Sequence, residues 1–340
     1  MTFRESYEHY TSKLDQSLSK VNDINLAKKR LTYSRWKVSE NLDKLLFEFE
    51  TNVKKNDSNV YWCPDAKTTI EQLNKQIKSY SKVEFFHHKA VKQMVQAADI
   101  KLPDPCEEPE LIVIGAKFII ANTGNFHAVF NSSDEYEKVL KAKKIVVIAG
   151  IDSVLSLQSE LYTARQLYAI FEKGELHYPF EILARPGRIR GMNAEISLLL
   201  LDINKSRLLD LPEHRPLFSL LNFELPPVCP MEQFNYEFDS WTYNDTLSTF
   251  LGAFTDGLKS NSLKINGNYG LEILSRYIPY DIDMYEQVME SRALLHAEDK
   301  KPGLLSFLDA DKSSVALNPK KFRDQEKFKK YAEHNFFGKF

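Results

Sequence analysis

Apolar residues recur with helical spacing in the first 55 positions of the chain. From residue 38 onward they follow in steps of three and four, at Val38, Leu42, Leu45, Leu46, Phe49 and Val53. This spacing places them on one face of an amphipathic helix, which Asp23 or Asn25 can cap at its start. A shorter helix is expected over residues 4–20, and neither segment contains glycine or proline. The pattern predicts a helical N-terminal arm over residues 1–55.

Beyond the arm, short apolar runs alternate with amphipathic segments and turn-forming residues. Strands are predicted at 60–63, 83–86, 111–121, 126–130, 144–150 and 195–203. Helices are predicted at 66–79, 89–98, 133–141 and 153–172, the last with Asp152-Ser153 as an N-terminal capping pair. Near-continuous apolar runs are typical of strands buried on both faces. The alternation predicts an α/β core over residues 56–215.

The C-terminal part of the chain has no strand pattern of this kind. Helices are predicted near 212–222, 244–257, 281–296 and 320–335. We therefore expect residues 216–340 to form a mainly helical extension.

Charge and cysteine content narrow the class of protein. The chain has 340 residues, with 45 basic and 47 acidic side chains and a net charge of −2. Since nucleic-acid binding usually shows as a basic excess, we expect no nucleic-acid partner. Three scattered cysteines are typical of a reducing compartment, and no apolar run reaches the length of about 20 residues that a membrane span needs. The sequence thus predicts a cytoplasmic protein without a membrane span.

A turn-forming tetrapeptide, Asn122-Thr123-Gly124-Asn125, follows directly on the predicted strand 111–121. A glycine in this position lets the backbone turn sharply, and N–H groups exposed there can bind a carboxylate or a phosphate. Asn122, Thr123 and Gly124 are therefore candidate ligand-binding residues. The alternative is an ordinary turn between two strands, because asparagine and glycine both favour turns.

Residues 185–191 read R-P-G-R-I-R-G and carry three guanidinium groups. Arginine side chains suit bidentate recognition of carboxylates and phosphates. Arg185 and Gly187 are candidate ligand-binding residues on this basis. The alternative is a solvated basic loop, or one paired with the acidic connector 101–110.

Asp202 stands at the end of a strongly apolar predicted strand. A carboxylate that is partly buried there is a candidate general base. It can equally cap the following turn, or pair with Lys205 or Arg207.

The histidines and cysteines give no metal-binding pattern. His87 and His88 directly follow the predicted strand 83–86. Adjacent residues of an extended chain point to opposite faces, so this pair is poorly placed to bind one metal ion. His127 lies beside the Asn-Thr-Gly turn and is read as a core or surface histidine, with a place facing the site as the alternative. We predict no metal and no bound cofactor.

Several motifs in order resemble the LUD (lactate-utilisation) domain family, in its iron–sulfur-subunit type. They are IIANTGNFHAVF (119–130), KAKKIVVIAGIDSV (141–154), Arg185-Pro186-Gly187 and LLLLDINKSRLLDLPEHR (198–215). The resemblance extends over roughly residues 25–230. It implies a fold like that of sugar-phosphate isomerases and CoA transferases, in which ligands sit outside the carboxyl ends of the strands. It also implies a role in lactate or related organic-acid metabolism.

The departures from this family concern its clusters and its site. The family's cysteine-rich insert reads PLFSLLNFELPPVCPMEQF (216–234) here, and only Cys229 survives in it. A four-iron cluster takes four cysteine thiolates, whereas the whole chain has three cysteines. Asn122 also replaces the family's usual aspartate, and Ile203-Asn204-Lys205 replaces Asn-Gly-Arg. We therefore expect a protein without an iron–sulfur cluster.

These observations leave three hypotheses about function. The first is a LUD-type protein of organic-acid metabolism that binds a small anionic ligand, as a cluster-free subunit or paralogue with partner subunits. The second is a non-catalytic binding or scaffold protein that works through its helical arms. The third is an isomerase or transferase acting on a phosphorylated or CoA-linked substrate.

Overall fold

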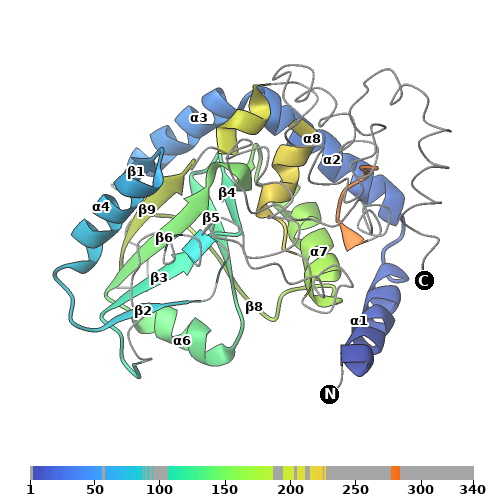
Figure 1. Cartoon of the computed structure of the whole chain (residues 1–340), viewed down its shortest axis with the longest axis horizontal. Helices are drawn as coiled ribbons and strands as arrows, with labels where there is room; N and C mark the ends of the chain where they lie inside the picture. Colours follow the sequence, from blue (N-terminus) through green and yellow to red (C-terminus); the bar gives the residue numbers. More distant parts are fainter. Residues whose placement is uncertain are drawn as a thin grey trace, which may run out of the picture.

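Five parallel strands form the central sheet. Their order across the sheet is β1 (Val60–Cys63), β9 (Glu195–Leu201), β6 (Lys144–Gly150), β3 (Leu111–Gly115) and β2 (Val83–Phe85). Consecutive strands β1 and β2 thus lie at opposite edges, and β3, β6 and β9 return step by step toward β1 (Figure 1). All four neighbouring pairs are parallel, so every carboxyl end lies at the same edge of the sheet. The predicted α/β fold class is confirmed.

The computed structural model describes only part of the chain. The described residues are 3–55, 58–86, 88, 90–91, 94, 106–186, 194–202, 205–210, 215–224, 226 and 277–283. The helices predicted at 244–257 and 320–335, the candidate Gly187 and the residual Cys229 lie outside them, as does most of the helix predicted at 281–296.

A second, smaller sheet packs beside the first. Its order is β7 (Val154–Leu155), β4 (Phe118–Ile120), β5 (Asn125–Phe130) and β8 (Phe180–Ala184). Strands β4 and β5 form an antiparallel hairpin, β8 is antiparallel to β5, and β7 is parallel to β4. The chain passes from the parallel sheet into this second sheet twice, after β3 and again after β6.

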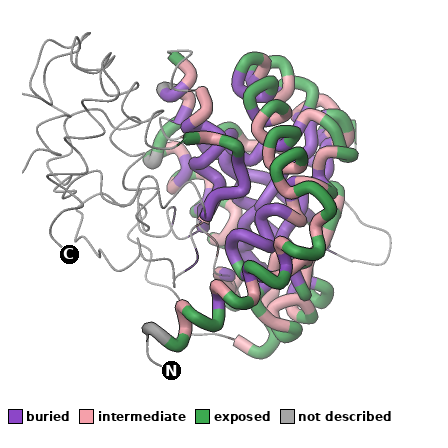
Figure 2. The backbone as a smooth tube through the Cα atoms, turned by 90° about the vertical axis from the view of Figure 1, so that its right-hand side faces the viewer, coloured by how far each residue is buried: buried purple, intermediate pink, exposed green. Residues whose placement is uncertain are grey.

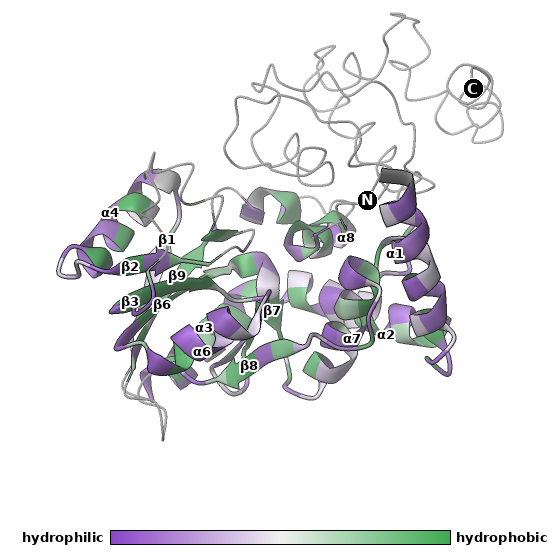
Figure 3. Ribbon diagram, turned by 90° about the horizontal axis from the view of Figure 1, so that it is seen from below, coloured by the Kyte–Doolittle hydropathy of each residue, from purple (hydrophilic) through white to green (hydrophobic). Residues whose placement is uncertain are grey.

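Helices surround the two sheets. The N-terminal helices are α1 (Phe3–Leu18), α2 (Ile24–Glu40) and α3 (Leu42–Lys54), and α1 and α2 both pack against α7 (Glu160–Lys173). Helix α4 (Ala66–Ile77) packs on β1 and β9, whereas α6 (Ser133–Lys141) packs on β5 and β8. The short helix α8 (Arg215–Phe218) and the 3-10 helix η4 (Ser219–Asn222) both contact α2. Figure 3 shows the hydrophobic colour concentrated on the strands, whereas α1 is largely hydrophilic.

Successive side chains along a strand belong in turn to two hydrophobic clusters, because they point to opposite faces of the sheet. On β6, Val146 and Ile148 belong to the cluster under α4, which also contains Cys63 and Leu73. Their neighbours Ile145, Val147 and Ala149 belong to the larger cluster between the two sheets. Every residue of β6 is buried, as expected for a central strand covered on both faces. Figure 2 shows the buried segments gathered in the interior of the described chain, with exposed segments around them.

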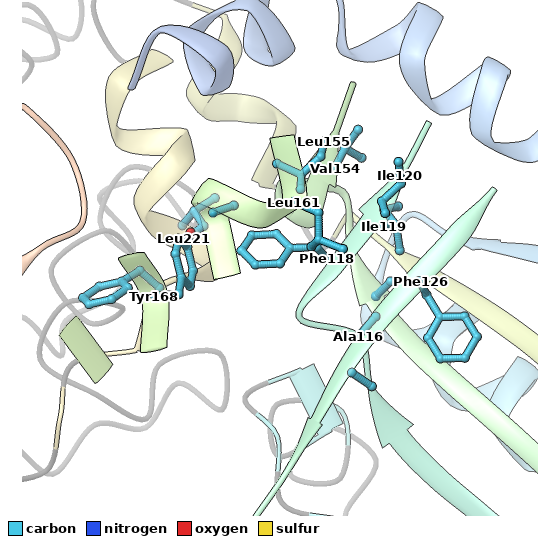
Figure 4. Close-up of a cluster of buried hydrophobic side chains, with 14 of the residues drawn as sticks. Ala116, Phe118, Ile119, Ile120, Phe126, Val154, Leu155, Leu161, Tyr168 and Leu221 are labelled. Carbon is cyan, nitrogen blue, oxygen red and sulfur yellow. The ribbon is translucent and has the colours of Figure 1, made fainter. Parts of the chain in front are cut away.

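The larger cluster joins both sheets to the helical segments. Around Phe118 of β4, side chains of β5, β7 and α7 meet (Figure 4), and the Phe118 ring lies edge-on to Tyr168 with 4.8 Å between ring centroids. The same cluster includes Tyr10 of α1 and Tyr280. The predicted arm, the α/β core and residues 277–280 of the predicted extension therefore share one core.

Three local predictions were wrong at their boundaries. The long N-terminal helix is broken at Asn41, whose backbone (φ −127°, ψ 24°) leaves the helical region between α2 and α3. The predicted strand 111–121 is two strands in different sheets, β3 and β4. The predicted helix 153–172 begins only at Glu160, because Val154 and Leu155 form strand β7.

Strand β8 was not predicted at all. Each of its residues is only partly buried or exposed, so its sequence FEILA lacks the apolar run that marks the other strands. Among the described residues, none of the helices is long and apolar enough to cross a bilayer.

Candidate functional site

The carboxyl edge of the parallel sheet gathers the polar groups that follow three neighbouring strands. Cys63 ends β1 in register with Leu201 of β9, and Leu201 is in register with Gly150 of β6. Asp202, directly after β9, donates its backbone N–H to the Cys63 carbonyl over 3.0 Å. In open α/β sheets this edge is where ligands bind.

A buried ion pair lies at this edge. The Lys205 ammonium is 2.6 Å from Asp152 Oδ1, and their side chains are 7% and 2% exposed. Asp152 follows β6, whereas Lys205 belongs to the 3-10 helix η2 (Lys205–Leu209) after β9. A Cβ atom on Gly150 would lie 2.0 Å from Asp152 Oδ1 and 2.5 Å from Lys205 Nζ. Only glycine therefore leaves room for the pair, which explains its place at the end of β6.

Arg35 of α2 is wholly buried and holds the backbone next to this pair. Its guanidinium donates hydrogen bonds to the carbonyl oxygens of Asp152 and Val154. These carbonyls lie where the chain passes from the parallel sheet to the second sheet. Arg35 thereby fixes the position of Asp152 relative to helix α2.

Asp202 is held by the first turn of η2. Its Oδ1 accepts the backbone N–H of Ser206 at 2.8 Å, and its Oδ2 accepts the Ser206 hydroxyl at 2.7 Å. The alternative that Asp202 caps the following turn is thus realised. Lys205 pairs instead with Asp152.

A cavity of about 440 Å³ opens between the ends of β1 and β9 and the junction of α2 with α3. Its walls are largely apolar, from leucines of α3, β9 and η2 together with Ile151 and Trp62. Its polar groups are two serines, Ser39 and Ser206, and three acids, Glu40, Asp43 and Asp202. No basic side chain is among the described residues that line it.

Cys63 lines the same cavity but is not suited to nucleophilic chemistry. Burial raises the pKa of its thiol to about 11. The reactive form of cysteine is the thiolate, and this thiol stays protonated near neutral pH. The described cysteines also do not fit an iron–sulfur cluster: Cys63 lies in the hydrophobic core, and Cys106 contacts Glu84, with 3.9 Å between Sγ and Oε2.

The predicted anion-binding turn is the hairpin between β4 and β5. The N–H groups of Thr123 and Gly124 both donate to the Ile120 carbonyl, at 3.3 and 2.9 Å. Gly124 has a φ of +67°, and a Cβ there would lie 2.9 Å from the backbone of Asn52 in α3. The glycine is therefore required by the turn and by its contact with α3. This geometry favours the ordinary-turn alternative, and ligand binding by the turn stays a prediction.

The other predicted ligand residues lie on the second sheet. Arg185 is exposed and directly follows β8. The side chain of Asn122 accepts the Gln158 N–H over 3.1 Å, and Asn125 donates to the Gln158 side chain over 3.1 Å. Of the predicted site residues that the structure describes, Asp202 alone lines the carboxyl-edge cavity. The structure thus separates Asp202 from the hairpin turn.

Comparison with known proteins gives one distant structural neighbour. No family model and no curated protein matches the chain. A solved structure described as a DUF162 family protein from Deinococcus radiodurans is similar over 47% of this chain and 98% of its own length. It is 11% identical, with a TM-score of 0.33. DUF162 is the LUD-domain family.

Sequence reasoning missed the buried groups of the site. Asp152 was interpreted as a helix cap, and Arg35 looks like any basic residue of an amphipathic helix. Lys205 was noted as an alternative partner of Asp202 and as the residue that stands where the LUD-like motif has arginine, but not as the partner of Asp152. The pairing of Asp152 with Lys205 joins residues 53 positions apart, which no local pattern can indicate.

His127 is expected to make the protein less stable as the pH falls below its usual pKa of 6.5. Burial lowers the pKa of this imidazole, although its hydrogen bond to Glu181 acts in the opposite direction. Between the folded and the unfolded pKa the unfolded chain binds more protons, so the free energy of unfolding falls with falling pH. Urea unfolding from pH 7.5 to 5.5 measures this slope. It should flatten in His127→Gln and persist in His9→Gln, an exposed control; an equal slope in all three proteins would contradict the assignment.

Proposed function

We propose that this chain is a small-molecule-binding protein built on a LUD-like α/β core, with its ligand in the carboxyl-edge cavity. The observation that carries the proposal is the cavity itself. It lies outside the carboxyl ends of two parallel strands, where ligands bind in open α/β sheets. Its volume of about 440 Å³ falls within the usual range for small-molecule sites.

The lining indicates the chemistry of the ligand. Apolar walls suit a hydrocarbon body, and Asp202 and Ser206 at one end suit a hydrogen-bond donor. Three acids line the cavity, and one of them, Glu40, is paired with Arg215 across 3.7 Å. A carboxylate ligand would meet like charge here, which costs binding energy. We therefore infer a neutral or cationic ligand, with Asp202 as the carboxylate that binds its donor group.

A role in lactate or related organic-acid metabolism, as a cluster-free subunit or paralogue, remains the finer proposal that the LUD resemblance supports. The acids of the carboxyl-edge cavity argue against placing an organic anion there. General-base catalysis by Asp202, the scaffold role, and isomerase or transferase activity rank below ligand binding, because the described side chains give them no specific support.

Three ligands with the same hydrocarbon ring test the proposal. Cyclohexylamine and cyclohexanol are expected to bind, and cyclohexanecarboxylate to bind more weakly than either. Because Trp62 lines the cavity and is 42% exposed, binding should change its fluorescence, and Trp62→Phe should remove the change. Asp202→Asn should weaken cyclohexylamine about tenfold through the lost charge-assisted hydrogen bond, with little effect on cyclohexanol.

Asp210→Asn is the matched control, since Asp210 is an exposed acid nearby in the chain. It should bind cyclohexylamine like the parent protein. If the carboxylate gives the strongest response that depends on Trp62, or if no ligand gives such a response, the proposal is wrong.

A further inference from the structure

A second cavity, of about 310 Å³, lies between strands β5 and β8 and helix α7. Its polar floor is formed by His127, Glu181, Arg165 and Gln158. Leu161, Tyr162 and Leu183 complete its lining. No residue is shared with the carboxyl-edge cavity.

Glu181 joins the two nitrogen-bearing side chains of the floor. Its Oε2 lies 2.8 Å from His127 Nε2, and its Oε1 accepts a hydrogen bond from Arg165. His127 is 1% exposed, whereas the Arg165 side chain is 33% exposed. The single carboxylate is thus fully engaged, and the remaining guanidinium N–H groups of Arg165 have no hydrogen-bond acceptor among the described residues.

One buried polar atom of this floor, His127 Nδ1, has no hydrogen-bond partner in the described part of the chain. His127 Nε2 already faces Glu181, so Nδ1 is the ring nitrogen that is left over. Buried polar atoms are nearly always bonded in native proteins. The unbonded nitrogen in the lining of this cavity indicates a partner that the described chain does not supply. When the imidazole is protonated, Nδ1 carries a hydrogen that a carboxylate oxygen can accept.

The charges favour an acid as this partner. Arg165 is the cation on the floor among the described residues. Lys117, the other cation near His127, is already paired with Glu172. Glu181 is the one acid among the described residues that line the cavity. Arginine is also the side chain that suits a carboxylate best.

The rim of the cavity favours an apolar body on that acid. Tyr162 and Leu183 line it and are 57% and 45% exposed. Arg165 lies over the Tyr162 ring, 5.7 Å from its centroid. Ligand-binding grooves are among the features that neighbouring exposed apolar side chains mark, and these two side chains can cover the hydrocarbon part of a ligand bound to Arg165.

We propose that this cavity is a second binding site, for a small hydrophobic monocarboxylate held by Arg165 and covered by Tyr162 and Leu183. The site goes beyond the ligand site at the sheet edge and differs from it in charge. A carboxylate in the cavity would also favour the charged imidazolium of His127. The groups that face this ring are Glu181 from β8, Arg165 from α7, Lys117 ahead of β4 and Tyr178, whose ring centroid is 6.4 Å away. Binding is therefore coupled to proton uptake.

Calorimetric titration of the full chain with benzoate tests this proposal. Benzamide, which has the same ring without the charge, should bind at least about tenfold more weakly, because charged hydrogen bonds to arginine are the strong ones. Arg165→Gln should weaken benzoate by a similar factor, and Tyr162→Ala should weaken both ligands. Matched controls are Arg30→Gln and Tyr33→Ala, which change exposed residues of α2.

Proton uptake supplies a second readout. Benzoate should bind more tightly at pH 6 than at pH 8, and His127→Asn should remove this dependence. The proposal is overturned if benzamide equals benzoate, if Arg165→Gln equals Arg30→Gln, or if benzoate does not bind. Should Arg165→Gln not fold, the ligand pair and Tyr162→Ala still decide. Asp202→Asn should bind benzoate as tightly as the parent protein does, and benzoate should leave the fluorescence of Trp62 unchanged. These two results separate this test from the test of the sheet-edge cavity.

Discussion

Replacing Arg35 by methionine is expected to lower the free energy of unfolding by about 3 kcal/mol or more. The side chain is wholly buried, and its guanidinium donates to the carbonyls of Asp152 and Val154. Methionine fills much of the space but leaves both carbonyls without these donors, and each orphaned buried group costs about 1–3 kcal/mol. Part of this loss is offset, because a buried cation no longer has to be desolvated.

Urea unfolding of three variants measures the effect. Arg35→Lys keeps the charge but cannot reach both carbonyls with a planar fork, so it should recover only part of the loss. Arg30→Met on the exposed side of the same helix should change stability by less than about 0.5 kcal/mol. A loss below about 1 kcal/mol in Arg35→Met would mean that the two carbonyls find other donors.

Asp152→Asn should be as damaging, because it leaves the Lys205 ammonium buried without its counter-charge. Removing one partner of a buried ion pair typically costs about 3–5 kcal/mol. The amide is close to the carboxylate in size, so the tight space beside Gly150 is preserved and charge is the main change. Lys205→Met should lower the free energy of unfolding in the same way, because it leaves the Asp152 carboxylate buried without its counter-charge.

The double variant distinguishes pairing from packing. With Asp152→Asn and Lys205→Met together, no unpaired charge remains, and stability should return to within about 1–2 kcal/mol of the parent protein. If the two losses simply add, the ion pair is not the source of the cost, and the effect comes from packing around each side chain.

The sequence predicted the strands of the core well where a short apolar run is bounded by turn-forming residues. Val60–Cys63 and Lys144–Gly150 were located to the residue, although β1 is mostly half-buried or exposed and β6 is buried throughout. Residues 111–121 were read as one strand because both β3 and β4 are fully buried. The change of sheet between them, at Ala116 and Lys117, is marked by a single charged residue. This lysine is buried and paired with Glu172, and one such residue did not divide the apolar run. Strand β8 was missed because its residues are partly buried or exposed and its sequence FEILA is interrupted by Glu181.

The candidate site was predicted in part. Asp202 was selected because a charge at the end of an apolar run is conspicuous. Asp152, Lys205 and Arg35 were not, because their burial comes from contacts between segments far apart in the chain. The same holds for Arg165 and Glu181, whose meeting depends on β8, an element the sequence did not reveal.

The place of β1 at the sheet edge has a consequence for synthesis on the ribosome. Its partner is β9, and Val60 pairs with Leu198, so β1 cannot join the sheet until most of the described core has been translated. Pairings between such distant residues slow folding, because the entropy cost of closing a long loop comes before any stabilising contact forms. The sheet-edge cavity lies at the carboxyl ends of these same two strands. A nascent chain must therefore emerge beyond Leu201 before it can bind a ligand there, and binding by stalled chains of increasing length would report the moment at which the sheet closes.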